Sequence, residues 1–146
     1  MAYRGKWQPN NKAKYEGNPT KIIFRSLWER AAFKWCDDNK NIQSWSSEEI
    51  VIPYKGIDGR FHRYYMDLKI TWNDGTTTLV EIKPEKQTKP PKKPKRQTKR
   101  YITEVRTFAT NSSKWIAAKD YAECRGWKFE IWTEKQLRSL GMKIYR

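Results

Sequence analysis

The pattern of apolar and polar residues predicts a helix near the start of the chain, followed by strands. Between residues 25 and 38, apolar side chains recur at the spacing i, i+3, i+4 and i+7, which places them on one face of a helix. They are Trp28, Ala31, Ala32 and Trp35. The run Glu49–Tyr54 is predicted as a short strand, and Pro53 restricts it to a sheet edge or a strand end.

A tight turn connects two further predicted strands. The first covers residues 60–70, and the second ends at Lys83. Between them, Asp74-Gly75 lies inside two apolar and β-branched runs, which is a strong hairpin signal. We therefore expect the two strands to lie antiparallel and side by side, so that Asp67 and Glu81 become neighbours.

Alternation along the second of these strands groups charged side chains. Successive residues of a strand point to opposite faces, so residues 79, 81 and 83 share one face while Val80 and Ile82 share the other. Glu81 and Lys83 therefore lie together. With Asp67 on the neighbouring strand, two carboxylates and one lysine are predicted to converge.

The C-terminal part of the chain predicts helices, one strand and a last short helix. Residues 101–108 and 115–122 carry apolar side chains at helical spacing. The polar residues 111–113 between them indicate a break, so two helices or one kinked helix are expected. Residues 127–132 are predicted as a fourth strand, and residues 133–140 as a short helix. The predicted fold class is α/β, with an αβββαβ core and a mixed four-stranded sheet flanked by helices.

Composition indicates a single domain with a polyanionic partner. The chain has 146 residues, including eight Trp, which are enough for one domain with a core. Lys and Arg number 31 against 16 Asp and Glu, which gives a net charge of +15 and favours nucleic acid as a ligand. No apolar run approaches the roughly 20 residues of a membrane span. Cys36 and Cys124 are expected to be reduced core residues of an intracellular protein.

Two segments carry much of the positive charge. Residues 1–20 form an arm in which basic residues alternate with Tyr and Trp. This arm either packs over the domain through its aromatic residues or contacts phosphates and bases. Residues 84–100 form a Pro- and Lys-rich loop of the domain 21–146, for which a spacer, an import signal and a clamp on DNA are the alternatives. We favour the clamp, through Lys86, Lys89, Lys92, Lys93, Lys95, Arg96, Lys99 and Arg100.

The predicted trio suits metal-assisted hydrolysis of a phosphodiester. Asp67, Glu81 and a backbone carbonyl such as that of Ile82 are oxygen ligands of the kind that Mg²⁺ prefers, and Mn²⁺ is expected to substitute. The metal would activate water, polarise the phosphate and stabilise the leaving oxygen. Lys83 would orient or deprotonate the water, or neutralise charge on the phosphoryl oxygens. The alternative is a pair of solvated carboxylates with a lysine partner.

Glu29 and His62 are further candidates, each with a structural alternative. Ser26 and Glu29 form a capping box at the start of the first predicted helix. In the functional interpretation, Glu29 is a third acid that coordinates a metal or holds a metal-bound water. His62 and Arg63 precede Asp67 on a predicted strand and are candidates for DNA binding, although a lone histidine on a strand is more often a packed or half-exposed residue.

The element order and the motif Asp67…Glu81-Ile82-Lys83 resemble the PD-(D/E)XK, or restriction-endonuclease-like, superfamily. Several tracts are similar to the head completion nucleases of T-even-type tailed phages, and related tracts occur in transposon-end-cleaving endonucleases. They are Tyr15-Glu16-Gly17, 25–29, 45–50, Pro53-Tyr54, 62–67 and 80–84. This resemblance implies that Asp67, Glu81 and Lys83 are catalytic and that Glu29 is the acid of the first helix. Met66 departs from the usual proline, which provides no ligand.

The residues and the resemblance together predict a Mg²⁺-dependent DNA endonuclease that leaves 5′-phosphate and 3′-hydroxyl ends. The resemblance implies that it acts late in phage assembly, on packaged DNA at the portal vertex. The expected partners are DNA and portal or neck proteins, without a membrane. The expected form is a monomer, in the host cytoplasm during assembly or in the virion at the head–tail vertex. The alternative is a non-catalytic DNA-binding or structural head-completion protein with a degenerate nuclease site.

Overall fold

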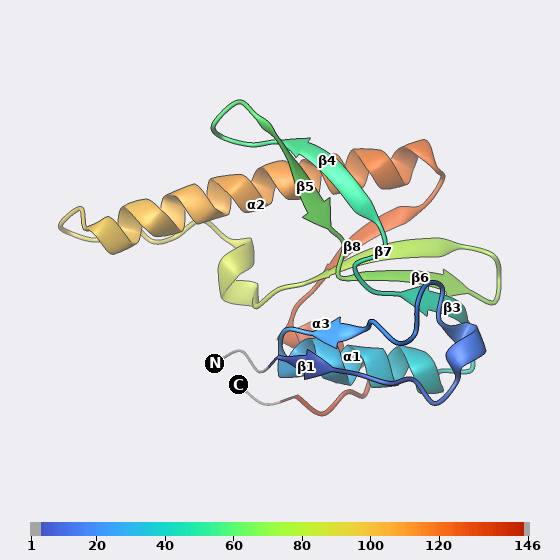
Figure 1. Cartoon of the computed structure of the whole chain (residues 1–146). Coiled ribbons are helices and arrows are strands. Elements are labelled where there is room, and N and C mark those ends of the chain that lie inside the picture. Colours follow the sequence, from blue (N-terminus) through green and yellow to red (C-terminus); the bar gives the residue numbers. More distant parts are fainter. Residues whose placement is uncertain (1–3, 145–146) are drawn as a thin grey trace.

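The computed structural model describes residues 4–144, and its elements follow the predicted alternation with several additions (Figure 1). The helices are α1 (Leu27–Asp38), α2 (Lys99–Cys124) and α3 (Glu134–Ser139), with the 3-10 turns η1 (Lys12–Lys14) and η2 (Glu85–Thr88). The strands are β1 (Gly5–Lys6), β2 (Ile23–Phe24), β3 (Ile42–Ser46), β4 (Val51–Lys55), β5 (Phe61–Tyr65), β6 (Leu68–Trp72), β7 (Thr77–Ile82) and β8 (Lys128–Trp132).

Four strands in the order β3-β6-β7-β8 form the central sheet. Strands β3, β6 and β7 are antiparallel neighbours, whereas β8 lies parallel to β7. The predicted α/β fold class with a mixed four-stranded sheet is therefore confirmed. Strand β3 was not predicted. Its buried residues Ile42 and Trp45 are three positions apart, and a register shift between Ile42 and Ser44 interrupts the period-two pattern that reveals a strand.

The predicted strand over residues 60–70 is two strands. β5 ends at Tyr65 and β6 begins at Leu68, and the chain changes sheets between them. Among the described residues β5 pairs only with β4, so β4 and β5 form a separate two-stranded hairpin that projects from the central sheet (Figure 1). Because the apolar pattern runs on without a break, the sequence did not reveal this switch.

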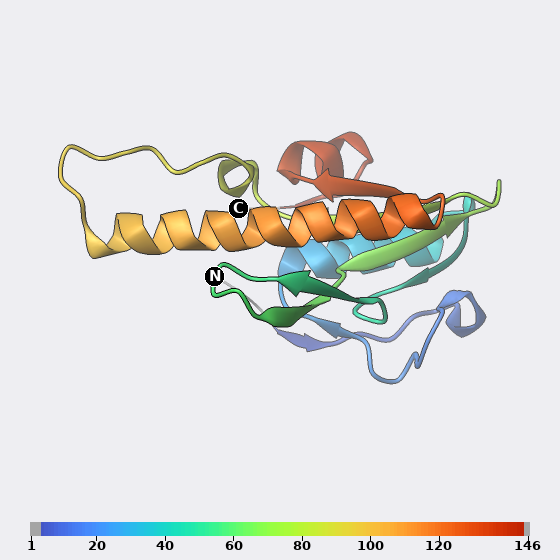
Figure 2. The same cartoon turned by 90° about the horizontal axis from the view of Figure 1, so that it is seen from above.

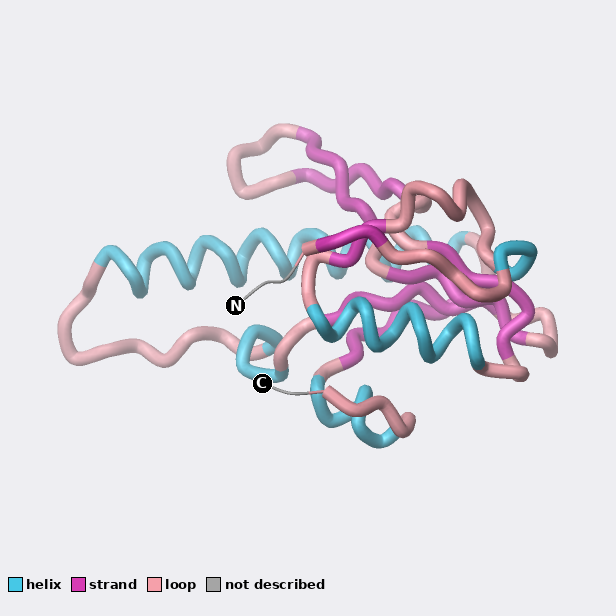
Figure 3. The backbone as a smooth tube through the Cα atoms, turned by 60° about the horizontal axis from the view of Figure 1, so that its bottom comes forward, coloured by secondary structure: helices cyan, strands magenta, loops and turns pink. Residues whose placement is uncertain are grey.

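Helices cover both faces of the central sheet. On one face, residues of α1 and α3 pack with Val80 and Ile82 of β7 in the larger apolar cluster, and Figure 3 shows α1 running across the strands on that side. On the other face, Ala118 and Ala122 of α2 pack against Leu79, and Figure 2 shows α2 lying across the sheet. Val80 and Ile82 thus point away from Leu79, as the alternation predicted.

The buried face of α1 is rotated from the predicted stripe. Ala32, Phe33 and Cys36 are fully buried, whereas Trp28 and Trp35 are only partly buried against the same cluster. Glu29 lies three and four residues before Ala32 and Phe33, so it is on the buried face as well. The helix therefore carries a carboxylate toward the interior.

The helix α2 runs without interruption from Lys99 to Cys124, so the predicted break at residues 111–113 is wrong. The hydroxyl groups of Ser112 and Ser113 donate to the carbonyl oxygens four residues earlier, which satisfies them within the helix. The first half of α2 extends beyond the sheet (Figure 2). Cys36 is buried as predicted, but Cys124 at the end of α2 is exposed.

The N-terminal segment packs on the domain. β1 pairs with β2, Trp7 packs against the larger apolar cluster, and Tyr15 is buried with its ring 4.8 Å from that of Trp45. Residues 4–20 of the predicted arm thus make packing contacts, residues 1–3 lie outside the described residues, and phosphate contact by the arm stays a prediction. Within residues 4–144, no helix combines the length and apolar character needed to cross a bilayer.

Candidate active site

Asp67 and Glu81 lie opposite each other at the ends of β6 and β7, as the hairpin pattern predicted. Leu68 pairs with Val80 in the antiparallel ladder, so Asp67 on one side of that pair faces Glu81 on the other. The Oδ2 atom of Asp67 accepts a hydrogen bond of 2.8 Å from the backbone N–H of Ile82. The strand pairing and this hydrogen bond fix Asp67 beside the end of β7.

Glu81 is held from two sides. Its side chain is buried, and its Oε2 atom accepts a hydrogen bond of 2.6 Å from the hydroxyl group of Tyr64 on β5. The Nζ atom of Lys83 lies 3.4 Å from its Oε1 atom. Lys114 of α2 lies over the ring of Tyr64, 5.6 Å from its centroid. The predicted convergence of Asp67, Glu81 and Lys83 is thus present in the structure.

The site concentrates negative charge. Withdrawal from water raises the pKa of Asp67 well above its usual 3.8, the charges of Glu81 and then Glu29 raise it further, and the hydrogen bond from Ile82 opposes them. Burial, followed by the charge of Glu81, also raises the pKa of the Tyr64 hydroxyl. Tyr64 therefore keeps its proton and remains a hydrogen-bond donor to Glu81. A cation bound at Asp67 would relieve the repulsion between the carboxylates of Asp67 and Glu81.

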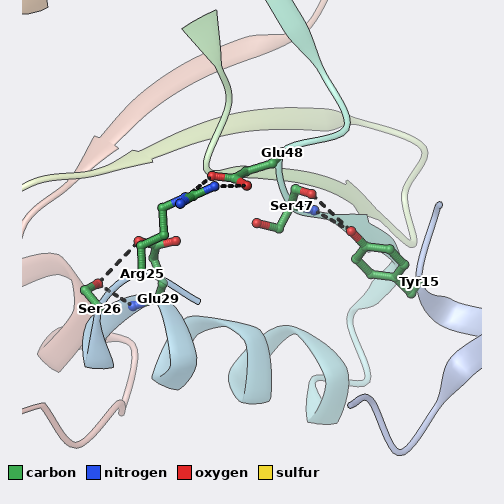
Figure 4. A network of polar contacts seen from close by, with 6 residues as sticks. All are labelled: Tyr15, Arg25, Ser26, Glu29, Ser47 and Glu48. Atoms are coloured by element: carbon green, nitrogen blue, oxygen red, sulfur yellow. Dashed lines mark hydrogen bonds and ion pairs between the residues drawn. The ribbon is translucent and has the colours of Figure 1, made fainter. Parts of the chain in front are cut away.

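Glu29 approaches from the first turn of α1 (Figure 4). Its backbone N–H donates to the Ser26 hydroxyl at 3.2 Å, and that hydroxyl lies 3.4 Å from its Oε2 atom, so Ser26 caps the helix as predicted. The Oε1 atom of Glu29 is buried without a hydrogen-bond partner within residues 4–144. Burial raises the pKa of Glu29 to about 7, against the lowering effect of the Arg25 backbone.

The site offers a divalent cation two carboxylates and a backbone carbonyl as oxygen ligands. Within residues 4–144, no three His, Cys, Asp or Glu side chains lie together in a group that could hold a metal ion. The role of Glu29 as a further metal ligand stays a prediction, and its charge acts on Asp67. Asp67 and Glu81, next to the backbone of Ile82, supply the hard oxygen atoms that Mg²⁺ and Mn²⁺ accept.

The other predicted DNA-binding residues lie outside this trio. The Nε2 atom of His62 is 3.0 Å from the carboxylate of Asp58, and its ring stacks on Tyr54. His62 and the exposed Arg63 are part of the hairpin β4–β5. His62 is exposed on the hairpin, and its role in DNA binding stays a prediction.

The basic segment is exposed and directly follows the site. Residues 85–88 form η2, residues 89–98 are irregular, and the last two predicted loop residues begin α2. All eight of its predicted DNA-binding residues are exposed. Only Lys89 and Arg100 among these eight form ion pairs within the described chain, with Glu85 and Glu104. The remaining charges are available to a polyanion.

Sequence reasoning missed three side chains around the acids. Tyr64 bonds Glu81, Lys114 lies over Tyr64, and Arg25 forms an ion pair of 2.8 Å with Glu48 beside Glu29 (Figure 4). Glu48 has a φ of 57°, in the left-handed region, which is uncommon for a residue other than glycine. No local pattern marks these residues, because each reaches the site from a different element.

Comparison with known proteins places the chain in a family of nucleases. Residues 39–134, which include Asp67, Glu81 and Lys83, match the family described as TnsA-like endonuclease N terminal. The head completion nuclease of Enterobacteria phage T4 is 47% identical over 148 residues, covering 98% of this chain and 99% of that protein. No solved structure matches. The chain therefore belongs to the TnsA-like endonuclease family, with a restriction-endonuclease-like fold.

Proposed function

We propose that this protein is a metal-dependent DNA endonuclease that hydrolyses phosphodiester bonds during phage head completion. The observation that carries the proposal is the meeting of Asp67, Glu81 and Lys83 at the end of β7, where burial and then the charge of Glu81 raise the pKa of Asp67. The match to an endonuclease family and the T4 relative support it.

Asp67 and Glu81, with the backbone carbonyl of Ile82, would hold Mg²⁺ or Mn²⁺. When bound, the ion would polarise the phosphate, activate water and stabilise the leaving 3′ oxygen. Tyr64 orients Glu81 by donating to Oε2, so that Oε1 stays directed toward Lys83. Lys83 orients the attacking water and neutralises charge that develops on the phosphoryl oxygens. The expected ends are a 5′-phosphate and a 3′-hydroxyl.

Glu29 acts from a second position. Its unpartnered Oε1 atom and its electrostatic effect on Asp67 suit a group that accepts a hydrogen bond from a metal-bound water. The exposed lysines and arginines of residues 86–100 bind the DNA backbone next to the scissile phosphate. Contacts of this kind recognise the backbone rather than base edges, so little sequence specificity is expected.

The relative supports a setting in phage head completion. A head completion nuclease of T4 is similar to this chain along nearly its whole length. We therefore place its action at the portal vertex, on packaged DNA before the tail joins, with portal or neck proteins as partners. It would be a monomer in the host cytoplasm and could remain in the virion.

Cleavage of supercoiled plasmid tests the proposal. The wild type should nick and linearise plasmid with Mg²⁺ or Mn²⁺ but not with EDTA, and Asp67→Asn should abolish cleavage while keeping DNA binding. Asp38→Asn, which changes an exposed aspartate at the end of α1, is the matched control and should cleave normally. Cleavage by Asp67→Asn at the wild-type rate would remove this carboxylate from the mechanism.

The second candidate function is a DNA-binding structural protein with a degenerate site. It is favoured by one observation, namely that no three acidic side chains form a metal cluster within residues 4–144. Wild-type protein that binds DNA but cleaves no plasmid, linear or nicked DNA with either metal would support this candidate.

A further inference from the structure

A cavity of about 900 Å³ lies between the basic segment and α2. Lys86, Gln87 and residues 89–92 form one wall, and residues of the first half of α2 form the other. Figure 2 shows the segment turning back alongside this part of the helix. Small-molecule sites have volumes of about 300–1,000 Å³. The cavity begins three residues after Lys83, so it adjoins the candidate active site along the chain.

Part of the lining is apolar and aromatic. Phe108 of α2 lies in the lining together with Pro90 and Pro91. The ring of Trp115 packs edge-on against Phe108, with centroids 6.4 Å apart and planes at 82°, which restricts the orientation of the Phe108 ring. A fixed aromatic face is the surface on which an unpaired base stacks, whatever its sequence.

Asn111 brings a side-chain amide to the same cavity. This residue is only 7% exposed and lies in the lining of the cavity. A side-chain amide has both a donor and an acceptor, so a ligand that offers the complementary pair of groups would bind well here. Asn111 also lines a smaller cavity of about 360 Å³, next to Arg106 and Lys114.

Positive charge surrounds the opening. Lys86, Lys89 and Lys92 line the cavity, and all three are exposed. Glu104 is the one acid in the lining, and it pairs with Arg100 at 3.0 Å. The cavity therefore combines an aromatic face, a side-chain amide and cations, which are the groups that bind a base, its polar edge and its phosphates.

We propose that this cavity binds an unpaired nucleotide of the DNA substrate. Phe108 stacks on the base, Asn111 hydrogen-bonds its edge, and Lys86 and Lys92 contact its phosphates. This inference rests on the proposed function and extends it to a substrate class. DNA with a single-stranded extension beside the scissile bond, as at ends or flaps, binds better than a continuous duplex.

Binding of matched duplexes to metal-free protein in EDTA tests the inference. The probes are a blunt duplex of 20 base pairs and the same duplex with a three-nucleotide thymidine overhang. Fluorescence anisotropy should show at least fivefold tighter binding of the overhang duplex by the wild type, because stacking of one base contributes at least this factor. Phe108→Leu should remove the preference and leave blunt-duplex binding within twofold. Phe61→Leu changes an aromatic residue that is 76% exposed on the hairpin β4–β5 and does not line the cavity, and it should retain the preference.

Asn111 provides a second, independent readout. The side-chain amide NMR signals of protein labelled at asparagine should shift on titration with the oligonucleotide dT5, and the Asn111 signal is assigned by its loss in Asn111→Ala. Equal binding of both duplexes by the wild type, or Asn111 signals that do not shift, would overturn the inference. Because no metal or cleavage is involved, that failure would leave the proposed nuclease function standing, and a catalytically inactive protein could still show the preference.

Discussion

Glu29 should make the stability of the metal-free protein depend on pH. Burial raises its pKa from an ordinary value of 4.5 to about 7, so between these values the folded state binds more protons than the unfolded state. The free energy of unfolding therefore falls as pH rises from about 4.5, and it levels off above pH 7. Replacing Glu29 by Gln keeps the shape of the side chain but removes this fall in the free energy of unfolding.

The magnitude follows from the two pKa values. A tenfold difference in proton affinity corresponds to about 1.4 kcal/mol, so the ionised Glu29 costs about 3 kcal/mol in the folded protein at pH 8. The stability of Glu29→Gln relative to wild type should increase by about this amount between pH 4.5 and pH 8. Urea unfolding in EDTA, followed by the fluorescence of the eight tryptophans, measures it at four pH values.

A matched control separates burial from the loss of a charge. Glu123→Gln changes an exposed glutamate on α2, and its stability relative to wild type reports the general effect of one negative charge fewer. If the difference between Glu29→Gln and wild type follows the control and stays constant from pH 4.5 to pH 8, Glu29 is not held in a charge-excluding position and the reasoning fails.

Three further predictions concern the acids and the basic segment. Mg²⁺ should raise the melting temperature more at pH 8 than at pH 5.5 in differential scanning fluorimetry, because the raised pKa of Asp67 lets protons compete with the metal; an equal rise at both would contradict this. Tyr64→Phe removes the hydrogen bond to Glu81 and should lower plasmid cleavage about 10- to 100-fold, whereas unchanged cleavage would show that Glu81 is oriented without it. Changing Lys92, Lys93 and Lys95 together to Gln should make the plot of log K against log salt on duplex DNA less steep, by about 0.9 for each phosphate that is no longer neutralised. An unchanged slope would mean that these residues do not contact the DNA backbone.

Local patterns in the sequence were sufficient for the hairpin and the trio. Asp74-Gly75 sets the turn, and the period of two along β7 places Glu81 and Lys83 on one side and Val80 on the other. These features depend on interactions between residues close in sequence. The convergence of Asp67, Glu81 and Lys83 therefore follows from the order of residues along the chain.

Only the tertiary structure decided what surrounds the acids. The apolar pattern of residues 60–70 is continuous, but backbone hydrogen bonds between Met66 and residues 48 and 50 direct β5 away from the central sheet and bring Tyr64 to Glu81. The buried face of α1 differs from the predicted apolar stripe, and this places Glu29 toward the interior. The local sequence around Glu29 indicates only a helix cap. Burial and electrostatic coupling depend on residues distant in sequence, so no local pattern encodes them.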